Sequence, residues 1–247
     1  MTLVAKDVSK HFGGLRAVDQ VSFEVERGQL FSLVGPNGAG KTTCFHTLTG
    51  FLPLTGGTVH VDGRDVSRMR PDQRVGVGMA RTFQTTTLFN GLTCVDNVSV
   101  ALARRHPHSL VRSLLLPWAT PNFAAQAEEI LERVGIVDSR HARADELSYG
   151  AQRRLAVAIA LATEPHFILL DEPAAGLNPK ESDAFGQLLR SLAASNVGVL
   201  LVEHDMRLVM EVSDWVHVLA QGRTLIAGKP EDVRRDPEVI AAYLGRR

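Results

Sequence analysis

The amino-acid sequence predicts an α/β fold that combines an N-terminal antiparallel β subdomain with an inserted helical subdomain. Apolar and polar residues alternate in the N-terminal third, which is typical of half-buried strands. Short apolar runs at 30–34, 167–170 and 197–202 are typical of buried strands in a parallel sheet. Between about 93 and 163, apolar residues recur every three or four positions, as they do in helices. We therefore expect an α/β lobe formed by 1–92 and 164–247, and a helical lobe formed by 93–163.

The N-terminal third contains the alternating strands. Val21, Phe23 and Val25 are separated by polar residues, and Val59 and Val61 alternate in the same way. The second pair is followed directly by Asp62-Gly63, a dipeptide that favours a tight hairpin turn. This part of the chain is therefore predicted to form half-buried strands and hairpins.

The composition fits a cytoplasmic protein and argues against several other classes. Lys plus Arg and Asp plus Glu both number 27, so bulk charge gives no reason to expect a nucleic-acid partner. Cys44 and Cys94 are too few for a disulfide framework. Residues 1–11 lack the apolar stretch of a signal peptide, and no apolar run approaches the roughly 20 residues that span a bilayer. We expect that this chain does not cross a membrane by itself.

The strongest chemical motif is Gly35-Pro-Asn-Gly-Ala-Gly-Lys41-Thr42, which follows a buried strand and precedes a helix. It matches the phosphate-binding loop of the P-loop NTPases, in which glycines let backbone N–H groups turn toward phosphates at a helix N-terminus. Lys41 is expected to reach the β- and γ-phosphates of ATP, and the Thr42 hydroxyl to bind Mg²⁺. The alternative is a glycine-rich turn with an exposed lysine. The residues expected at the nucleotide are Gly35, Pro36, Asn37, Gly38, Ala39, Gly40, Lys41, Thr42 and Thr43.

A second apolar strand ends in two adjacent carboxylates, Asp171 and Glu172. In P-loop enzymes an Asp at such a strand end binds Mg²⁺. Neighbouring side chains of a strand point to opposite faces, so the two carboxylates cannot do the same work in a regular strand. We expect Asp171 to bind the metal and Glu172 to face the water that attacks the γ-phosphate. Acidic residues at a strand end are common, and only the phosphate-binding loop makes this interpretation specific.

The segment Leu147-Ser148-Tyr149-Gly150-Ala151-Gln152 stands at a predicted helix start and resembles the signature motif of ABC ATPases. At a helix N-terminus, Ser148 and the backbone of Gly150 can bind a γ-phosphate held by a second subunit. The alternative is a plain Ser N-cap. Tyr149 and Ala151 depart from the common signature, in which Gly and Gln are frequent.

The resemblance to ABC ATPases covers essentially the whole chain and implies further roles by position. Gln84 falls where the family has the glutamine that contacts the metal and the attacking water, and His204 falls at the histidine that contacts the γ-phosphate. Phe12 falls at the aromatic residue that stacks on adenine, although it could instead be a core residue of the first hairpin. The implied catalytic residues are Lys41, Gln84, Glu172 and His204, and the implied metal ligands are Thr42, Gln84 and Asp171.

The segment 175–178 falls at the loop that contacts the partner subunit in ABC ATPases, and it ends at Asn178. Asn178, Pro179 and Glu181 also form a complete helix start, with Asn as N-cap, Pro in the first helical position and Glu at the capping-box position. Asn178 is therefore expected to cap a helix, and it can contact a partner subunit as well.

Several segments look much like one subfamily, the ATPases of branched-chain amino acid importers that pair with a second, similar ATPase. These segments are 148–155, 171–179, 202–206 and 241–245. Similar motifs occur in importers of urea, amides or aromatic acids, so the cargo stays open. The resemblance implies ATP and Mg²⁺ as cofactors. As partners it implies a homo- or heterodimer of ATPases, transmembrane permease subunits and, indirectly, a solute-binding protein. It places the chain at the cytoplasmic face of the inner membrane.

Three alternatives have a different function: the ATPase of an exporter or lipid transporter, a soluble nucleotide-dependent regulator, and an ABC ATPase of DNA repair or translation. Intact Glu172 and His204 argue against a regulator that hydrolyses ATP poorly. The chain has no room for the long coiled coil or the second ATPase copy of the repair and translation proteins.

The segment 104–123 is least like a generic ABC core. It contains Leu115 and Trp118 among several other large apolar residues, with Arg104, Arg105 and Arg112 close by. It is expected either to be buried in the helical lobe or to form a surface that contacts the transporter or anionic lipid.

Overall fold

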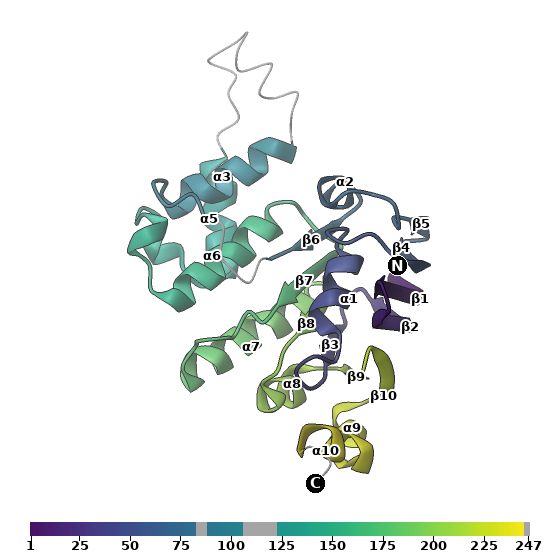
Figure 1. Ribbon diagram of the computed structural model, residues 1–247. Helices are drawn as coiled ribbons and strands as arrows, with labels where there is room; N and C mark the ends of the chain where they lie inside the picture. The colour runs from purple at the N-terminus through teal and green to yellow at the C-terminus, as the bar shows by residue number, and fades with distance from the viewer. Residues whose placement is uncertain (83–87, 106–122, 245–247) are drawn as a thin grey trace. The chain divides into compact units, whose positions relative to one another are not determined.

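The computed structural model describes residues 1–82, 88–105 and 123–244 (Figure 1). They form two compact units, Met1–Arg81 with His166–Arg247, and Thr82–Pro165. No helix in the described ranges is long and apolar enough to span a bilayer.

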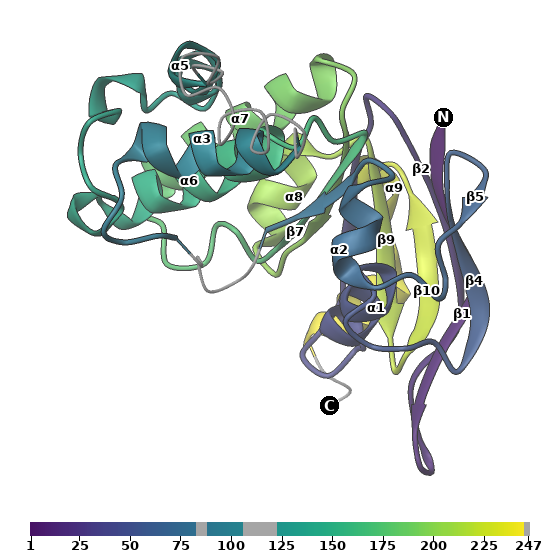
Figure 2. The same cartoon turned by 90° about the horizontal axis from the view of Figure 1, so that it is seen from above.

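The first unit contains a four-stranded antiparallel sheet in the order β2-β1-β4-β5. Its strands are β1 (Thr2–Phe12), β2 (Leu15–Glu26), β4 (Gly56–Val61) and β5 (Arg64–Asp65), and Figure 2 shows β1 beside β4. Asp62 and Gly63 both have positive φ, 50° and 80°, as the predicted tight turn between β4 and β5 requires. The antiparallel N-terminal region predicted from the sequence is confirmed.

The same unit contains a six-stranded sheet in the order β10-β9-β3-β8-β7-β6. Strands β3, β8, β7 and β6 are parallel, β9 lies parallel to β3, and β10 pairs antiparallel with β9. All residues of β3, β7 and β8 are buried, which explains their almost continuous apolar sequences. The bounds are β3 (Leu30–Val34), β6 (Met79–Arg81), β7 (Phe167–Asp171), β8 (Gly198–Val202), β9 (Trp215–Ala220) and β10 (Arg223–Gly228).

Helix α1 (Lys41–Leu48) packs between the two sheets. Its Cys44, Phe45 and Leu48 belong to one core cluster with residues of both sheets, such as Val59 of β4 and Leu200 of β8. Helix α1 is therefore anchored on both sides. The other helices of this unit are α2 (Pro71–Val75), α7 (Pro179–Ala194), α8 (Met206–Val212), α9 (Pro230–Arg235) and α10 (Pro237–Leu244).

Arg74 of α2 binds the C-terminal end of α1. Its guanidinium group is buried and donates hydrogen bonds to the carbonyl oxygens of Thr47 and Leu48, and to those of Ser67 and Met69. The last carbonyl groups of a helix have no partner inside the helix, and a buried one must find a partner elsewhere. Burial lowers the pKa of Arg74 to about 10, so the side chain stays charged at neutral pH.

The second unit is helical. It contains α3 (Cys94–Arg105), α5 (Ala124–Arg133) and α6 (Tyr149–Leu161), which contact one another, and two short 3₁₀ turns, η2 (Val137–Ser139) and η3 (Ala144–Glu146). The helical patterns at 124–134 and 148–162 are confirmed. The segment 106–122, which includes Leu115 and Trp118, lies outside the described residues.

Candidate nucleotide-binding site

The loop from Gly35 to Gly40 connects β3 to α1, and two of its glycines are required by packing. A Cβ atom on Gly35 would lie 2.2 Å from the carbonyl oxygen of Leu219, and one on Gly40 would lie 2.3 Å from that of Ala17. Gly40 also has φ 101°, a conformation that favours glycine. A hydrogen bond from the Gly222 N–H to the Ala39 oxygen, 2.9 Å, links the loop to the turn between β9 and β10. The loop is therefore held in shape by its own unit.

Lys41 begins α1 and folds back over this loop. Its Nζ donates hydrogen bonds to the carbonyl oxygens of Gly35, 2.7 Å, and Pro36, 3.2 Å. The residue is only 7% exposed, which contradicts the alternative of a solvent-exposed lysine. Burial lowers the pKa of the ammonium group, while Glu172 and Asp171 act in the opposite direction. The cation therefore lies near both carboxylates at the N-terminus of a helix, where anions bind well.

Asp171 is the last residue of β7 and is almost fully buried. Burial and the charge of Glu172 raise its pKa to about 6, with a smaller contribution from Glu203, while Arg81 and Lys41 oppose the shift. When neighbours raise the pKa of a carboxyl group in this way, a bound cation would stabilise its charged form. In the described ranges, no cluster of three His, Cys, Asp or Glu side chains could hold a metal.

Glu172 leaves the strand in a left-handed backbone conformation, with φ 46°. Such a conformation is rare for a residue with a side chain, and it persists only when the surroundings enforce it. The Glu172 N–H donates to the carbonyl oxygen of Val202, 2.8 Å, so the turn stays attached to β8. Its carboxylate oxygen Oε1 lies 3.8 Å from Nδ1 of His204, a residue that follows β8. The structure thus brings the two expected catalytic residues together.

Phe12 lies at the end of β1 and is 47% exposed. This exposure argues against the alternative of a core residue. The ammonium group of Lys10 lies 5.0 Å from the centre of its ring, on one face. An exposed aromatic ring at a strand end is available for stacking on a base.

The signature segment lies in the second unit. Ser148 is the N-cap of α6, and its hydroxyl oxygen accepts a hydrogen bond from the Ala151 N–H, 3.3 Å. Tyr149 is exposed, and its ring contacts the guanidinium group of Arg153. Gln84 lies outside the described residues, so its expected place at the metal and water stays a prediction.

Two family models match the chain. One, described as ABC transporter, matches residues 18–175, and the other, described as branched-chain amino acid ATP-binding cassette transporter, matches residues 227–247. The chain belongs to the ABC transporter family. It is similar at 43% identity to LivG of Salmonella typhimurium and to BraF of Pseudomonas aeruginosa. Both are described as high-affinity branched-chain amino acid transport ATP-binding proteins, and each match covers 98% of this chain and 97% of the relative.

Two solved structures of ABC ATP-binding cassettes have the same fold. A nucleotide-free cassette has a TM-score of 0.86 at 28% identity, and a cassette in its ADP conformation has a TM-score of 0.86 at 29% identity. Both matches cover 100% of each chain. The α/β fold with its antiparallel β region and the ATP-binding function expected from the resemblance are therefore confirmed, and this ABC subunit is an ATPase.

Sequence reasoning missed two residues close to the loops of this ABC ATPase. Glu203 is fully buried beside His204, although charged residues rarely lie in a core. Tyr243 of α10 has a buried hydroxyl group near the backbone of Gly35, and burial raises its pKa to about 12. Glu203 could have been noticed as a charge directly after a buried strand. Nothing in the local sequence places Tyr243 beside a loop that lies more than 200 residues earlier in the chain.

Proposed function

We propose that this chain is the ATP-hydrolysing subunit of an importer for branched-chain amino acids or related small polar solutes. The observation that carries hydrolysis is the gathering of Lys41, Asp171, Glu172 and His204 at the loop between β3 and α1. The cargo rests on the likeness to LivG and BraF over nearly the whole chain, and on the match of 227–247 to the branched-chain amino acid transporter model.

In this proposal the triphosphate of ATP lies on the loop 35–43, and the adenine stacks on Phe12. Backbone N–H groups at the start of α1 and the Lys41 ammonium group bind the phosphate oxygens. Thr42, which is exposed, and Asp171 would hold Mg²⁺, because hydroxyl and carboxylate oxygens suit this cation. When bound, Mg²⁺ neutralises charge on the phosphates.

Glu172 accepts a hydrogen bond from the attacking water and orients it toward the γ-phosphate, in this proposal. His204 binds the γ-phosphate and steadies Glu172 across the 3.8 Å between their side chains. Lys41 stabilises the negative charge that develops on the transferred group. Catalysis by these residues therefore combines general-base activation of the water by Glu172 with positioning and charge stabilisation, and it needs no covalent intermediate.

The partner in the working unit is proposed to be a second ATPase, the same chain or a similar one. The Ser148 hydroxyl and the Gly150 backbone of one subunit would bind the γ-phosphate held by the other. A hydroxyl group can accept one hydrogen bond and donate another, so the cap of α6 leaves the Ser148 O–H free for a phosphate. ATP would close the pair, and hydrolysis would let it open. The pair would do so while bound to permease subunits at the cytoplasmic face of the inner membrane.

Glu172→Gln tests the proposed hydrolysis. Removing the base should lower kcat by about 100-fold or more while the Kd for ATP changes by less than about threefold, because base catalysis contributes roughly 10²–10⁴ in rate. Glu211→Gln, an exposed glutamate of α8, is the matched control and should hydrolyse ATP normally. Near-normal turnover of Glu172→Gln would contradict the assignment.

The cargo is tested by transport. The chain is co-expressed with its membrane partners, the complex is placed in vesicles, and ATP-driven uptake of leucine, urea and an aromatic acid is compared. Uptake of leucine is expected. Exclusive uptake of another solute would contradict the cargo while leaving the ATPase assignment intact.

A further inference from the structure

Glu203 is the most deeply buried carboxylate beside the proposed catalytic residues. It follows β8 directly, and its exposed fraction is 0%. Oε1 accepts a hydrogen bond from the Ala174 N–H, 2.9 Å, and Oε2 accepts one from the His204 N–H, 3.1 Å. A buried charge is costly unless it is fully hydrogen-bonded, so a residue that served only to fill space here would be apolar. The two hydrogen bonds therefore indicate a role for Glu203 beyond filling space.

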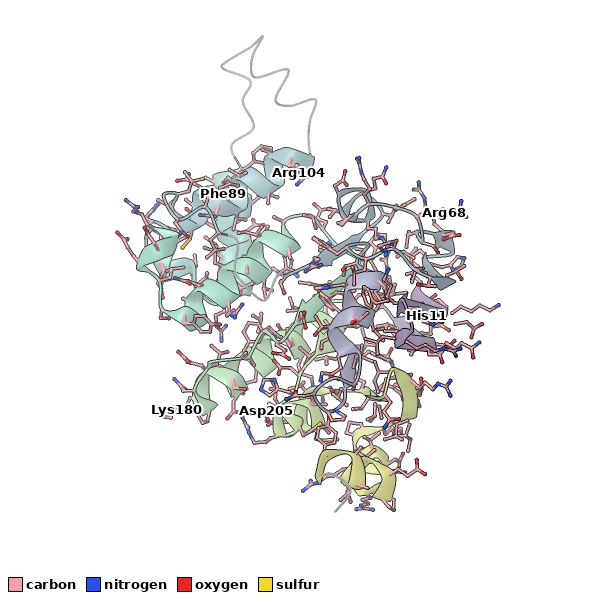
Figure 3. The ribbon with its side chains drawn as sticks, in the orientation of Figure 1. His11, Arg68, Phe89, Arg104, Lys180 and Asp205 are labelled. Atoms are coloured by element: carbon pink, nitrogen blue, oxygen red, sulfur yellow. The ribbon has the colours of Figure 1, made fainter. Side chains whose placement is uncertain are left out.

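The two oxygens join loops that come from different strands. Ala174 lies two residues after Glu172, in the turn that follows β7, and His204 lies in the turn that follows β8. One carboxylate thus binds the backbone of both turns at once. Asp205, which follows His204 and is labelled in Figure 3, caps α8 by accepting hydrogen bonds from the N–H groups of Arg207 and Leu208. The backbone of His204 therefore lies between two residues whose side chains are hydrogen-bonded to backbone N–H groups.

The turn at Glu172 needs such support. Its left-handed backbone is strained, and strained residues keep their conformation only when neighbouring interactions enforce it. The hydrogen bond from the Glu172 N–H to Val202 fixes the start of the turn, and the bond from the Ala174 N–H to Glu203 fixes its end. Together they set the direction of the Glu172 side chain, and they bring Oε1 to 3.8 Å from Nδ1 of His204.

We propose that Glu203 is a positioning residue that keeps the turns of Glu172 and His204 in one arrangement, and so controls the rate of ATP hydrolysis without contacting ATP. The proposal rests on the roles proposed above for those two residues. Glu203 would then link two turns. One leads into 175–178, the segment expected to contact the partner subunit, and the other carries His204, the residue proposed to bind the γ-phosphate. A change in either turn is then passed to the other through one side chain.

Glu203→Gln is the direct test, because glutamine has the same shape but only one acceptor oxygen. The amide can accept one of the two backbone N–H groups, and its NH₂ group cannot accept the other. One turn is therefore released while the packing volume stays the same. We expect kcat to fall at least tenfold, with the KM for ATP within threefold of wild type.

Val199→Ala is the matched control. It opens a small cavity near the start of the same strand, β8, at the end away from both turns. Rates of all variants are divided by the fraction of protein that binds a fluorescent ATP analogue. Val199→Ala should lower the melting temperature and leave kcat near wild type. A loss of kcat in Glu203→Gln no larger than in Val199→Ala would overturn the proposal.

The double variant Glu172→Gln with Glu203→Gln shows whether Glu203 acts through Glu172. If it does, the loss of kcat in the double variant should be smaller than the product of the losses in the two single variants. A fully multiplicative loss would overturn the proposal. Near-normal turnover of the single variant Glu172→Gln would instead refute the proposed function itself, so the two failures are distinguishable.

A shorter carboxylate covers the case in which Glu203→Gln does not fold. Glu203→Asp keeps the charge but cannot reach both backbone N–H groups, and the same fall in kcat at unchanged KM is expected. Wild-type turnover in Glu203→Asp would show that charge alone suffices and would overturn the two-point link.

Discussion

Acidification should destabilise the first unit through His217. This residue of β9 is 2% exposed, and its ring packs against those of Phe23 and Phe31. Nε2 lies 2.9 Å from the Thr224 hydroxyl oxygen. Burial lowers the pKa of the His217 ring to about 4, from the ordinary 6.5. The imidazole is therefore neutral in the folded protein at every pH well above 4.

The magnitude follows from the two pKa values. The unfolded chain takes up a proton at this position near pH 6.5, whereas the folded chain takes it up only near pH 4. The full contribution of the neutral ring to stability is thus present above pH 6.5, and it is lost as the pH falls toward 4. By proton linkage the loss is about 2 kcal/mol at pH 5 and reaches about 3 kcal/mol below pH 4.

The assay is urea unfolding at pH 7.5 and pH 5.0, followed by the fluorescence of Trp215. Trp215 begins β9 two residues before His217, and Trp118→Phe removes the other tryptophan. His217→Gln, which does not titrate, should lose about 2 kcal/mol less than the parent protein between the two pH values. His141→Gln, at an exposed position, serves as control and should behave like the parent. Equal losses in His217→Gln and the parent would refute the reasoning.

Two further predictions concern Phe12 and Arg74. Stacking on a base is worth about 1–3 kcal/mol, so Phe12→Ala should raise the Kd for ATP roughly 5- to 150-fold in equilibrium dialysis. Phe12→Tyr should change the Kd little. An unchanged Kd in Phe12→Ala would contradict stacking. Arg74→Met removes the buried donor that binds the carbonyl oxygens of Thr47 and Leu48 at the end of α1, and it should lower the free energy of unfolding by at least about 2 kcal/mol in urea titrations. A smaller loss would exclude this role.

The elements with strong local signals were predictable from the sequence. The apolar runs identify β3, β7 and β8, because strands buried on both faces leave no room for polar residues. Asn178 and Glu181 form the capping box that the sequence predicts at the start of α7. The expected difference between Asp171 and Glu172 also has a structural basis. Glu172 is turned away by its left-handed backbone, rather than by strand alternation alone.

Contacts between distant segments could not be predicted. The order of the six strands depends on pairings such as that of β3 with β8, which local periodicity does not contain. The same holds for Arg74, whose partners at 47 and 48 lie in another helix. Glu203 is buried because the turn after β7 folds over it. The neighbouring sequence does not contain this contact, so it does not distinguish Glu203 from an exposed charged residue. Gln84 and the segment 104–123 stay predictions, because residues 83–87 and 106–122 lie outside the described part of the chain.

The position of β3 in its sheet has a consequence for synthesis on the ribosome. Leu30 of β3 pairs with Val199 of β8, and Phe31 pairs with Trp215 of β9. At about 5–20 residues per second, the first of these neighbours is made roughly 10 to 30 s after β3. During that interval the nascent chain displays an apolar strand without its partners, and the phosphate-binding loop lacks the contacts with Leu219 and Gly222 that hold its shape. Chaperone contact with the first 40 residues should therefore persist until β8 emerges, and slower translation beyond the helical unit should prolong it.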